Sequence, residues 1–431
     1  MIRRTSIVLL WLALAGPAWA QETIVEGPGY QLGEGTVFHP SVGAGTGLIY
    51  NPYYESSNTT TTPVVRLRGA FSLASQGNRP AGELSLLRDD TDDGGERAAP
   101  DLDFRLGGVA DYQWWAAATG SPNAHRLSGA FDGQVKTTPR GPMSLYAHDT
   151  LMRVADPTNY ESYSRNLNRV INRLTAGAEF RPGGGAFRFA GQYENLVDVF
   201  ESADAGFANR IHHRLRARAE WQFLPITRFF VDASWGYFVA TGGDCNLLKN
   251  ESRPLRIELG ASSAFTERTS LRVHLGAGRG FYKARPECAS SSAPPVDFVS
   301  PLFGNYMGLL LGAELGYRYS PLGRISVSYE HDFEDSVQAN FYRDHALVGR
   351  VVHQLDRILL QLSGDLRVRG YRGLAPGLPD PVSETVLLRL SGKGYYPLRD
   401  WLGFMGDATL EGDSGFGYTR LSLQLSAVAA F

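Results

Sequence analysis

The strongest constraint on this chain is an alternation of polar and apolar side chains with a period of two residues. Segment 210–223, RIHHRLRARAEWQF, shows it plainly, because Arg214, Arg216 and Arg218 alternate there with leucine and alanine. A helix would spread these arginines around its axis, whereas a strand sends alternate side chains to opposite faces. The segment is therefore predicted to be a strand with one charged and one apolar face.

The same alternation recurs along most of the chain. It is found in RFFVDASWGY, RISVSYEHDF and RILLQLSGDLRVRG, and the apolar face of the second segment holds Ile325, Val327, Tyr329 and Phe333. Tight turns such as FLPITRF and YSPLGRI alternate with longer polar connections. Short turns on one side, long loops on the other and strands of roughly 10 alternating residues are typical of outer-membrane β-barrels.

The bilayer explains this arrangement. Backbone groups cannot pair with water inside it, so a sheet that crosses it closes on itself, with apolar faces on lipid and polar faces inside. We expect an all-β fold, a transmembrane antiparallel up-and-down barrel of about 18 strands, with 16 to 20 possible. GELSLLR at 82–88 could add a strand. A secreted β-sandwich or propeller is the alternative, but aromatic residues gather at the predicted strand ends, as at membrane interfaces.

The two ends of the chain agree with this fold. Residues 1–20 have a basic start, a short apolar run and a small-residue ending, the pattern of a signal peptide. Residues 21–36 are expected to form a short periplasmic segment and residues 37–431 the barrel. The final TRLSLQLSAVAAF ends on Phe431 and resembles the C-terminal signal of outer-membrane barrels. We expect the protein in the outer membrane of a Gram-negative cell, in contact with its lipid and lipopolysaccharide.

The middle of the chain, residues 148–237, carries more than a barrel pattern. It contains HDTLMRVADPTN, then RNLNRVINRLTAGAEFRPGGGAFRFAGQYENLVDVFE, then NRIHHRLRARAEWQFLPITRFFVDASWGY. This region resembles the β-barrel porins found with exopolysaccharide export machinery (VpsM-like porins). The residues that carry the resemblance are Arg153, Asp156, Pro157, Asn172, Pro182, Tyr193, Asn209, His213, Phe223, Pro225 and Thr227.

The resemblance implies an integral outer-membrane barrel that takes part in export of an exopolysaccharide, as conduit or as outer-membrane anchor of the machinery. A periplasmic export protein is the implied partner, as a separate polypeptide, because residues 21–36 are too few for a periplasmic scaffold. Two alternatives stay open: a structural barrel of a motility or adhesion complex, and a passive porin. The formal charge of -2 does not indicate nucleic-acid binding.

The charged strand faces are the candidate functional surface. Arginine stays charged at any relevant pH and binds carboxylates or phosphates bidentately, so a line of arginines can guide an acidic polymer. Glu194, Asp198 and Asp232 of neighbouring strands are expected on the same face and would instead neutralise that line. Both interpretations stay open. The candidate lumen-lining residues are Arg214, Arg216, Arg218, Glu220, Glu330, Asp332, Arg357, Asp365, Arg367 and Arg369.

No catalytic, metal or cofactor site is predicted, and the chain is not expected to be an enzyme. His148 precedes Asp149 and His331 precedes Asp332, but adjacent strand residues point to opposite faces and cannot act together. The acidic run Asp89–Glu96 offers carboxylates to calcium, but it lacks a calcium-loop motif and is expected to be a solvated connection.

The chain has two cysteines, Cys245 and Cys288. They fall in long loops that flank the hairpin predicted from segments 253–265 and 269–283, so strand parity places both on the same side of the membrane. In an oxidising compartment we expect them to form a disulfide, and two free thiols are the alternative.

Overall fold

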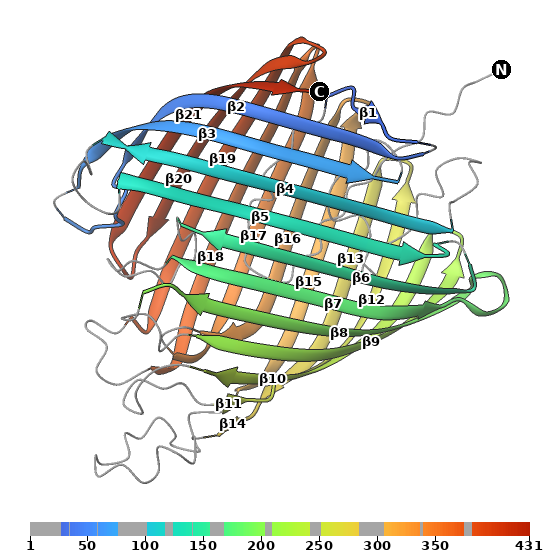
Figure 1. Cartoon of the computed structure of the whole chain (residues 1–431). Helices are drawn as coiled ribbons and strands as arrows, with labels where there is room; N and C mark the ends of the chain where they lie inside the picture. Colours follow the sequence, from blue (N-terminus) through green and yellow to red (C-terminus); the bar gives the residue numbers. More distant parts are fainter. Residues whose placement is uncertain are drawn as a thin grey trace.

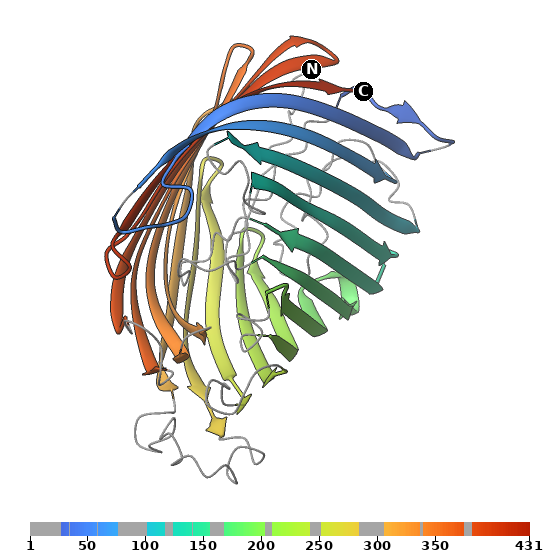
Figure 2. The ribbon, with the colours of Figure 1, turned by 60° about the vertical axis from the view of Figure 1, so that its left-hand side comes forward.

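The protein is a closed barrel made of one antiparallel sheet. The computed structural model describes residues 27–33, 35–57, 59–75, 101–116, 124–139, 141–155, 168–202, 209–241, 251–283, 306–336, 339–374 and 382–431. The sheet has 21 strands, of which β1, β11 and β14 have only 2 residues each. The remaining 18 pair in chain order, and the first of them, β2, also pairs with the last, β21. Figures 1 and 2 show this closure, with the blue β2 beside the red β21.

The bounds of the long strands are β2 (Val37–Tyr50), β3 (Thr61–Ala74), β4 (Leu102–Trp115), β5 (His125–Thr137), β6 (Met143–Val154), β7 (Arg169–Phe180), β8 (Phe187–Phe200), β9 (Arg210–Leu224), β10 (Thr227–Ala240), β12 (Leu255–Thr266), β13 (Thr269–Gly280), β15 (Tyr306–Ser320), β16 (Gly323–Asp335), β17 (Ala339–Leu355), β18 (Ile358–Leu374), β19 (Glu384–Arg399), β20 (Leu402–Asp413) and β21 (Tyr418–Ala430). The short elements are β1 (Tyr30–Gln31), β11 (Glu251–Ser252), β14 (Tyr282–Lys283) and the 3-10 turn η3 (Pro182–Gly184).

The predicted fold class and strand number are confirmed. Segment 210–223 lies within β9, and RISVSYEHDF lies within β16. The segment at 82–88, the acidic run Asp89–Glu96 and the expected signal peptide at 1–20 lie outside the described residues. The division of the chain at residues 20 and 36 stays a prediction.

One edge of the barrel carries tight turns, and the other carries mostly longer loops; we call them the turn edge and the loop edge. Two-residue turns join β9 to β10, β12 to β13, β15 to β16, β17 to β18 and β19 to β20, all at the turn edge. The long connection at this edge is 75–101, between β3 and β4. The β7–β8 turn needs glycine, because Gly183 (φ 58°) and Gly185 (φ 93°) adopt the left-handed conformation that other residues disfavour.

The two faces of the sheet differ sharply in polarity. In β9, Leu215 and Phe223 are 53% and 52% exposed, whereas Arg218 and Glu220, which point the other way, are 5% and 6% exposed. The charged side chains are thus covered, and the apolar ones face out. This is the reverse of a soluble sheet.

Aromatic rings gather on the outer face near the turn edge. Trp221 lies against Phe187, Phe223 and Phe229, with ring centroids 6.4, 5.0 and 6.2 Å away. A closed sheet with an apolar outer face and such a girdle is the form in which strands cross a bilayer. The chain is therefore an outer-membrane β-barrel. Among the described residues, no helix is long and apolar enough to cross a membrane.

The predicted disulfide falls outside the described residues, since neither Cys245 nor Cys288 is among them. Their two loops are nevertheless brought together, because β11 in one loop pairs with β14 in the other, with Ser252 opposite Tyr282. The disulfide stays a prediction.

The topology can be tested by labelling intact cells. Short turns of such barrels face the periplasm, so a cysteine introduced by Gly184→Cys, in the β7–β8 turn, should be inaccessible to an impermeant thiol reagent. A cysteine introduced by Ser57→Cys, exposed in the β2–β3 loop, should be labelled. The opposite pattern would overturn the orientation.

Candidate functional site in the barrel interior

Contacts between strands that are not neighbours define the inner face. Arg256 of β12 lies 3.3 Å from a carboxylate oxygen of Asp332 and 3.2 Å from one of Glu334, both on β16, although β13 and β15 lie between. Only side chains inside a closed barrel can meet across two intervening strands. The charged faces recognised in the sequence therefore line the interior.

The arginines of β9 are neutralised one by one. The guanidinium of Arg216 lies 2.7 Å from Asp232 on β10, and that of Arg218 lies 2.6 Å from Glu220 on its own strand. Arg214 lies 3.9 Å from Glu334 of β16 and stands opposite Glu194 of β8. Closer to the loop edge, Arg210 and Arg169 share Asp198 at 3.1 and 3.3 Å.

A second group of predicted lumen residues lies on β18. Asp344 of β17 accepts hydrogen bonds from Arg369 at 2.7 Å and from Arg367 at 3.3 Å, and Arg367 also contacts Asp365 at 2.8 Å. The ring of Tyr342 stacks on the Arg369 guanidinium, with its centroid 3.7 Å away. Arg357 does not belong to this wall, because it lies in the exposed turn before β18.

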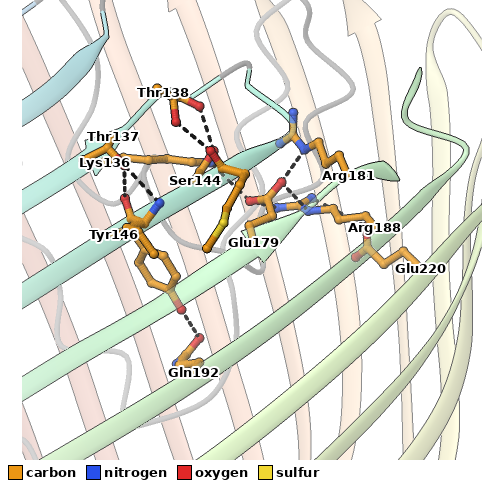
Figure 3. Close-up of polar contacts among 12 residues, drawn as sticks. Lys136, Thr137, Thr138, Ser144, Tyr146, Glu179, Arg181, Arg188, Gln192 and Glu220 are labelled. Atoms are coloured by element: carbon orange, nitrogen blue, oxygen red, sulfur yellow. Dashed lines mark hydrogen bonds and ion pairs between the residues drawn. The ribbon is translucent and has the colours of Figure 1, made fainter. Parts of the chain in front are cut away.

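Near the turn edge, Glu179 is the centre of a buried network of opposite charges (Figure 3). The carboxylate is 1% exposed and receives Lys136 at 3.3 Å, Arg188 at 2.9 Å and the Arg181 guanidinium. Arg188 continues the network to Glu220, 3.5 Å away on β9. Strands β5, β7, β8 and β9 are thus tied together on the inner face, and the contact of Lys136 with Glu179 spans β6, which lies between β5 and β7.

The substitution Glu179→Gln should destabilise the barrel strongly. Removing one partner of a buried ion network leaves the remaining charges uncompensated, which costs about 3–5 kcal/mol. The matched control is Glu201→Gln, because Glu201 is 33% exposed in its pair with Arg153, and exposed pairs contribute about 0–1 kcal/mol. Urea unfolding in lipid vesicles measures both, and equal losses for the two variants would contradict the assignment.

The β16–β17 hairpin leaves the wall near the loop edge and folds inward. Pairing of β16 with β15 stops where His331 faces Leu311, whereas pairing with β17 continues to Asp335 opposite Phe341. Beyond this point β16 contacts β12 through Arg256, and Ser252 donates to Asp335 at 2.9 Å. The hairpin tip therefore reaches across the inner surface of β13 and β15 and narrows the interior at this edge.

An apolar cluster fixes the hairpin to the inner wall. Its members are Tyr282, Tyr306, Leu310, Phe333 and Phe341. The rings of Phe333 and Tyr306 stack at 3.9 Å, and Gly278 makes room, since a Cβ there would come 2.5 Å from Phe333. The expectation that Phe333 belongs to the lipid-facing side is wrong: it is 1% exposed. The inward fold turns that face of β16 toward the wall.

Releasing the hairpin should widen the passage. Arg256 donates to the Phe333 carbonyl and contacts both Asp332 and Glu334, so Arg256→Gln should give a larger and more variable single-channel conductance in planar bilayers. Arg253→Gln, exposed at the same edge, should leave the conductance unchanged. Equal conductance in a folded Arg256→Gln barrel would show that Arg256 does not hold the hairpin.

The two His–Asp pairs of the sequence are divided between the faces. His148 lies 2.6 Å from Asp132, whereas Asp149 accepts a hydrogen bond from Asn172 at 2.9 Å on the outer face. His331 stacks on His345 at 4.2 Å, while Asp332 contacts Arg256. The two residues of each pair therefore make separate contacts, and the hydroxyl near His148 is that of Thr150, 3.2 Å away.

Several residues of the exopolysaccharide-porin resemblance lie on the outer face. Arg153 pairs bidentately with Glu201, at 2.6 and 2.7 Å. Asn172 contacts Asp149, and the Tyr193 hydroxyl lies 2.7 Å from the ring nitrogen of His213. The residues that carry the resemblance therefore belong largely to the outer wall of the barrel. Asp156 and Pro157, which also carry it, lie outside the described residues.

Solved structures with a similar course of the chain are outer-membrane proteins of Pseudomonas aeruginosa. OccK2 (OpdF), determined in complex with glucuronate, has 10% sequence identity and a TM-score of 0.44, with 91% of this chain and 97% of that chain covered. The outer membrane protein opdK has 8% identity and a TM-score of 0.43, with 91% and 98% covered. The siderophore receptor PirA has 10% identity and a TM-score of 0.41, with 91% and 80% covered. No family model and no curated protein matches the sequence.

Proposed function

We propose that the barrel forms a polar passage through which an exopolysaccharide is exported across the outer membrane. The observation that carries the proposal is the inner face, which is charged from the turn edge, at Glu179, to the loop edge, at Asp198. A hydroxyl-rich polymer cannot enter hydrocarbon without losing its hydrogen bonds, so it needs such a surface. The resemblance of residues 148–237 to barrels of export machinery supports a polysaccharide as the cargo.

The ion pairs of the β9 arginines with carboxylates determine how firmly these arginines could hold the polymer. Each of Arg210, Arg216 and Arg218 already has a carboxylate within 3.1 Å. Arginines in such pairs stiffen the wall and offer sugars a charge-balanced polar surface. A polymer would then slide along β9 rather than bind tightly to it. Under this proposal a separate periplasmic export protein delivers the polymer to the turn edge.

The inward β16–β17 hairpin favours a second candidate function, a passive porin for small polar solutes. A fixed constriction suits small molecules, whereas a polymer requires the hairpin to move aside. Conductance and solute uptake that stay the same whether or not polymer is being made would support the porin.

Deletion of the gene distinguishes the two candidate functions, polysaccharide export and passive uptake of small solutes. Export predicts that the deletion strain loses its surface polysaccharide while its synthesis enzymes remain, because the polymer has no other route through the bilayer. Quantifying surface and cell-retained polysaccharide measures this, with re-expression of the intact chain as the control. Normal surface polysaccharide in the deletion strain would refute the export proposal and leave the passive porin or a structural barrel.

A further inference from the structure

A recess lies on the inner face of β13, β15, β16 and β17, close to the turn edge. Ser270, Gly316, Ser326 and Arg350 stand side by side on these four strands, since Ser270 pairs with Gly316, Gly316 with Ser326 and Ser326 with Arg350. Gly316 contributes no side chain, so no side chain stands on the wall between the two serines. A Cβ at Gly316 would come 2.7 Å from the Ser270 hydroxyl, which therefore points into this space.

Two buried polar atoms at this recess lack a hydrogen-bond partner among the described residues. They are the Ser270 hydroxyl and the Nε of Arg350. Ser270 is 5% exposed, so water cannot readily replace a partner there. A buried polar group left without a hydrogen-bond partner destabilises the fold. Two such donors beside one recess can both bind an acceptor that the described part of the chain does not supply.

Two arginines, Arg324 and Arg350, bring positive charge to the recess. Arg324 stands diagonally to Arg350 on the neighbouring strand, about 7–8 Å away between Cα atoms. Neither arginine makes an ion pair or hydrogen bond within the described part of the chain, in contrast to the β9 arginines. Arg324 also interacts electrostatically with Arg318, and Glu314 is the acidic residue that acts on both Arg324 and Arg350.

We propose that this recess, formed by Ser270, Gly316, Ser326, Arg324 and Arg350, is an oxyanion-binding site. Two guanidinium groups and two hydroxyls match the acceptor oxygens of a carboxylate, sulfate or phosphate. The site lies at the turn edge, where cargo enters from the periplasm under the proposed function. It therefore deepens that function by specifying an acidic polysaccharide, one that carries uronate carboxylates or ester-linked sulfate or phosphate.

Binding can be measured on the purified barrel without any export assay. Inorganic phosphate or an oligogalacturonate added at the turn side of a planar bilayer should block the current in the wild type, and a neutral malto-oligosaccharide of equal length should not. Block by phosphate alone would place a free anion at the site, and block by both anions would support the acidic polymer.

The double variant Arg324→Gln, Arg350→Gln should raise the half-blocking concentration about a hundredfold, roughly tenfold for each charged hydrogen bond lost. Ser270→Ala keeps every charge and should raise it about tenfold. Arg357→Gln removes one charge at the same edge but outside the recess, and it should change nothing.

Equal block in the wild type and in a folded double variant would overturn the site. Loss of block in Arg357→Gln to the same degree would also overturn it, because net charge alone would then explain the effect. Both results are independent of whether deletion of the gene abolishes surface polysaccharide, so the site and the export proposal fail separately.

Discussion

Closure of the backbone hydrogen-bond ladder is the constraint on which the rest of the structure depends. A sheet edge in hydrocarbon would expose a row of unpaired groups, each costing several kcal/mol. Here β2 meets β21 from Ser41 opposite Ala430 to Tyr50 opposite Leu421. The glycines of GAGTG make the close approach possible, since a Cβ at Gly45 or Gly47 would come within 2.2 Å of β21. The sequence of β2, the first long strand, thus allows the β2–β21 pairing that closes the barrel.

Closure creates a second problem, because it encloses the charged face of every strand. Enclosed charges need partners or water, and an unpaired buried charge is far costlier than a paired one. The barrel meets this condition by placing acids and bases at positions where neighbouring strands bring them together, as for Arg216 and Asp232. This general pairing gives the recess its significance, since Arg324 and Arg350 depart from it on the same inner face.

The alternation of residue types was enough to predict most of the wall. Strands β9 and β10 were predicted closely, because their alternation is unbroken and the turn between them is sharp. The same reasoning failed at Phe333, because alternation says which face a residue shares but not whether that face stays on lipid. The inward fold depends on Arg256 and Gly278, which lie in other strands far along the chain. Arg357 continues the alternation of β18 in the sequence, but it is part of the exposed turn that precedes the strand.

The two arginines of the recess and the constriction belong to one hairpin. Strands β16 and β17 pair without interruption from Gly323 opposite His353 to Asp335 opposite Phe341, so the ladder that carries Ser326 and Arg350 near the turn edge also carries Phe333 near the loop edge. The turn of a hairpin fixes the register of its two strands, so their alignment is kept along the whole ladder. An anion held between Arg324 and Arg350 would therefore engage the same rigid unit whose far end narrows the passage. Under the proposed function, this one hairpin would contribute both to the selection of cargo at one edge and to the width available at the other.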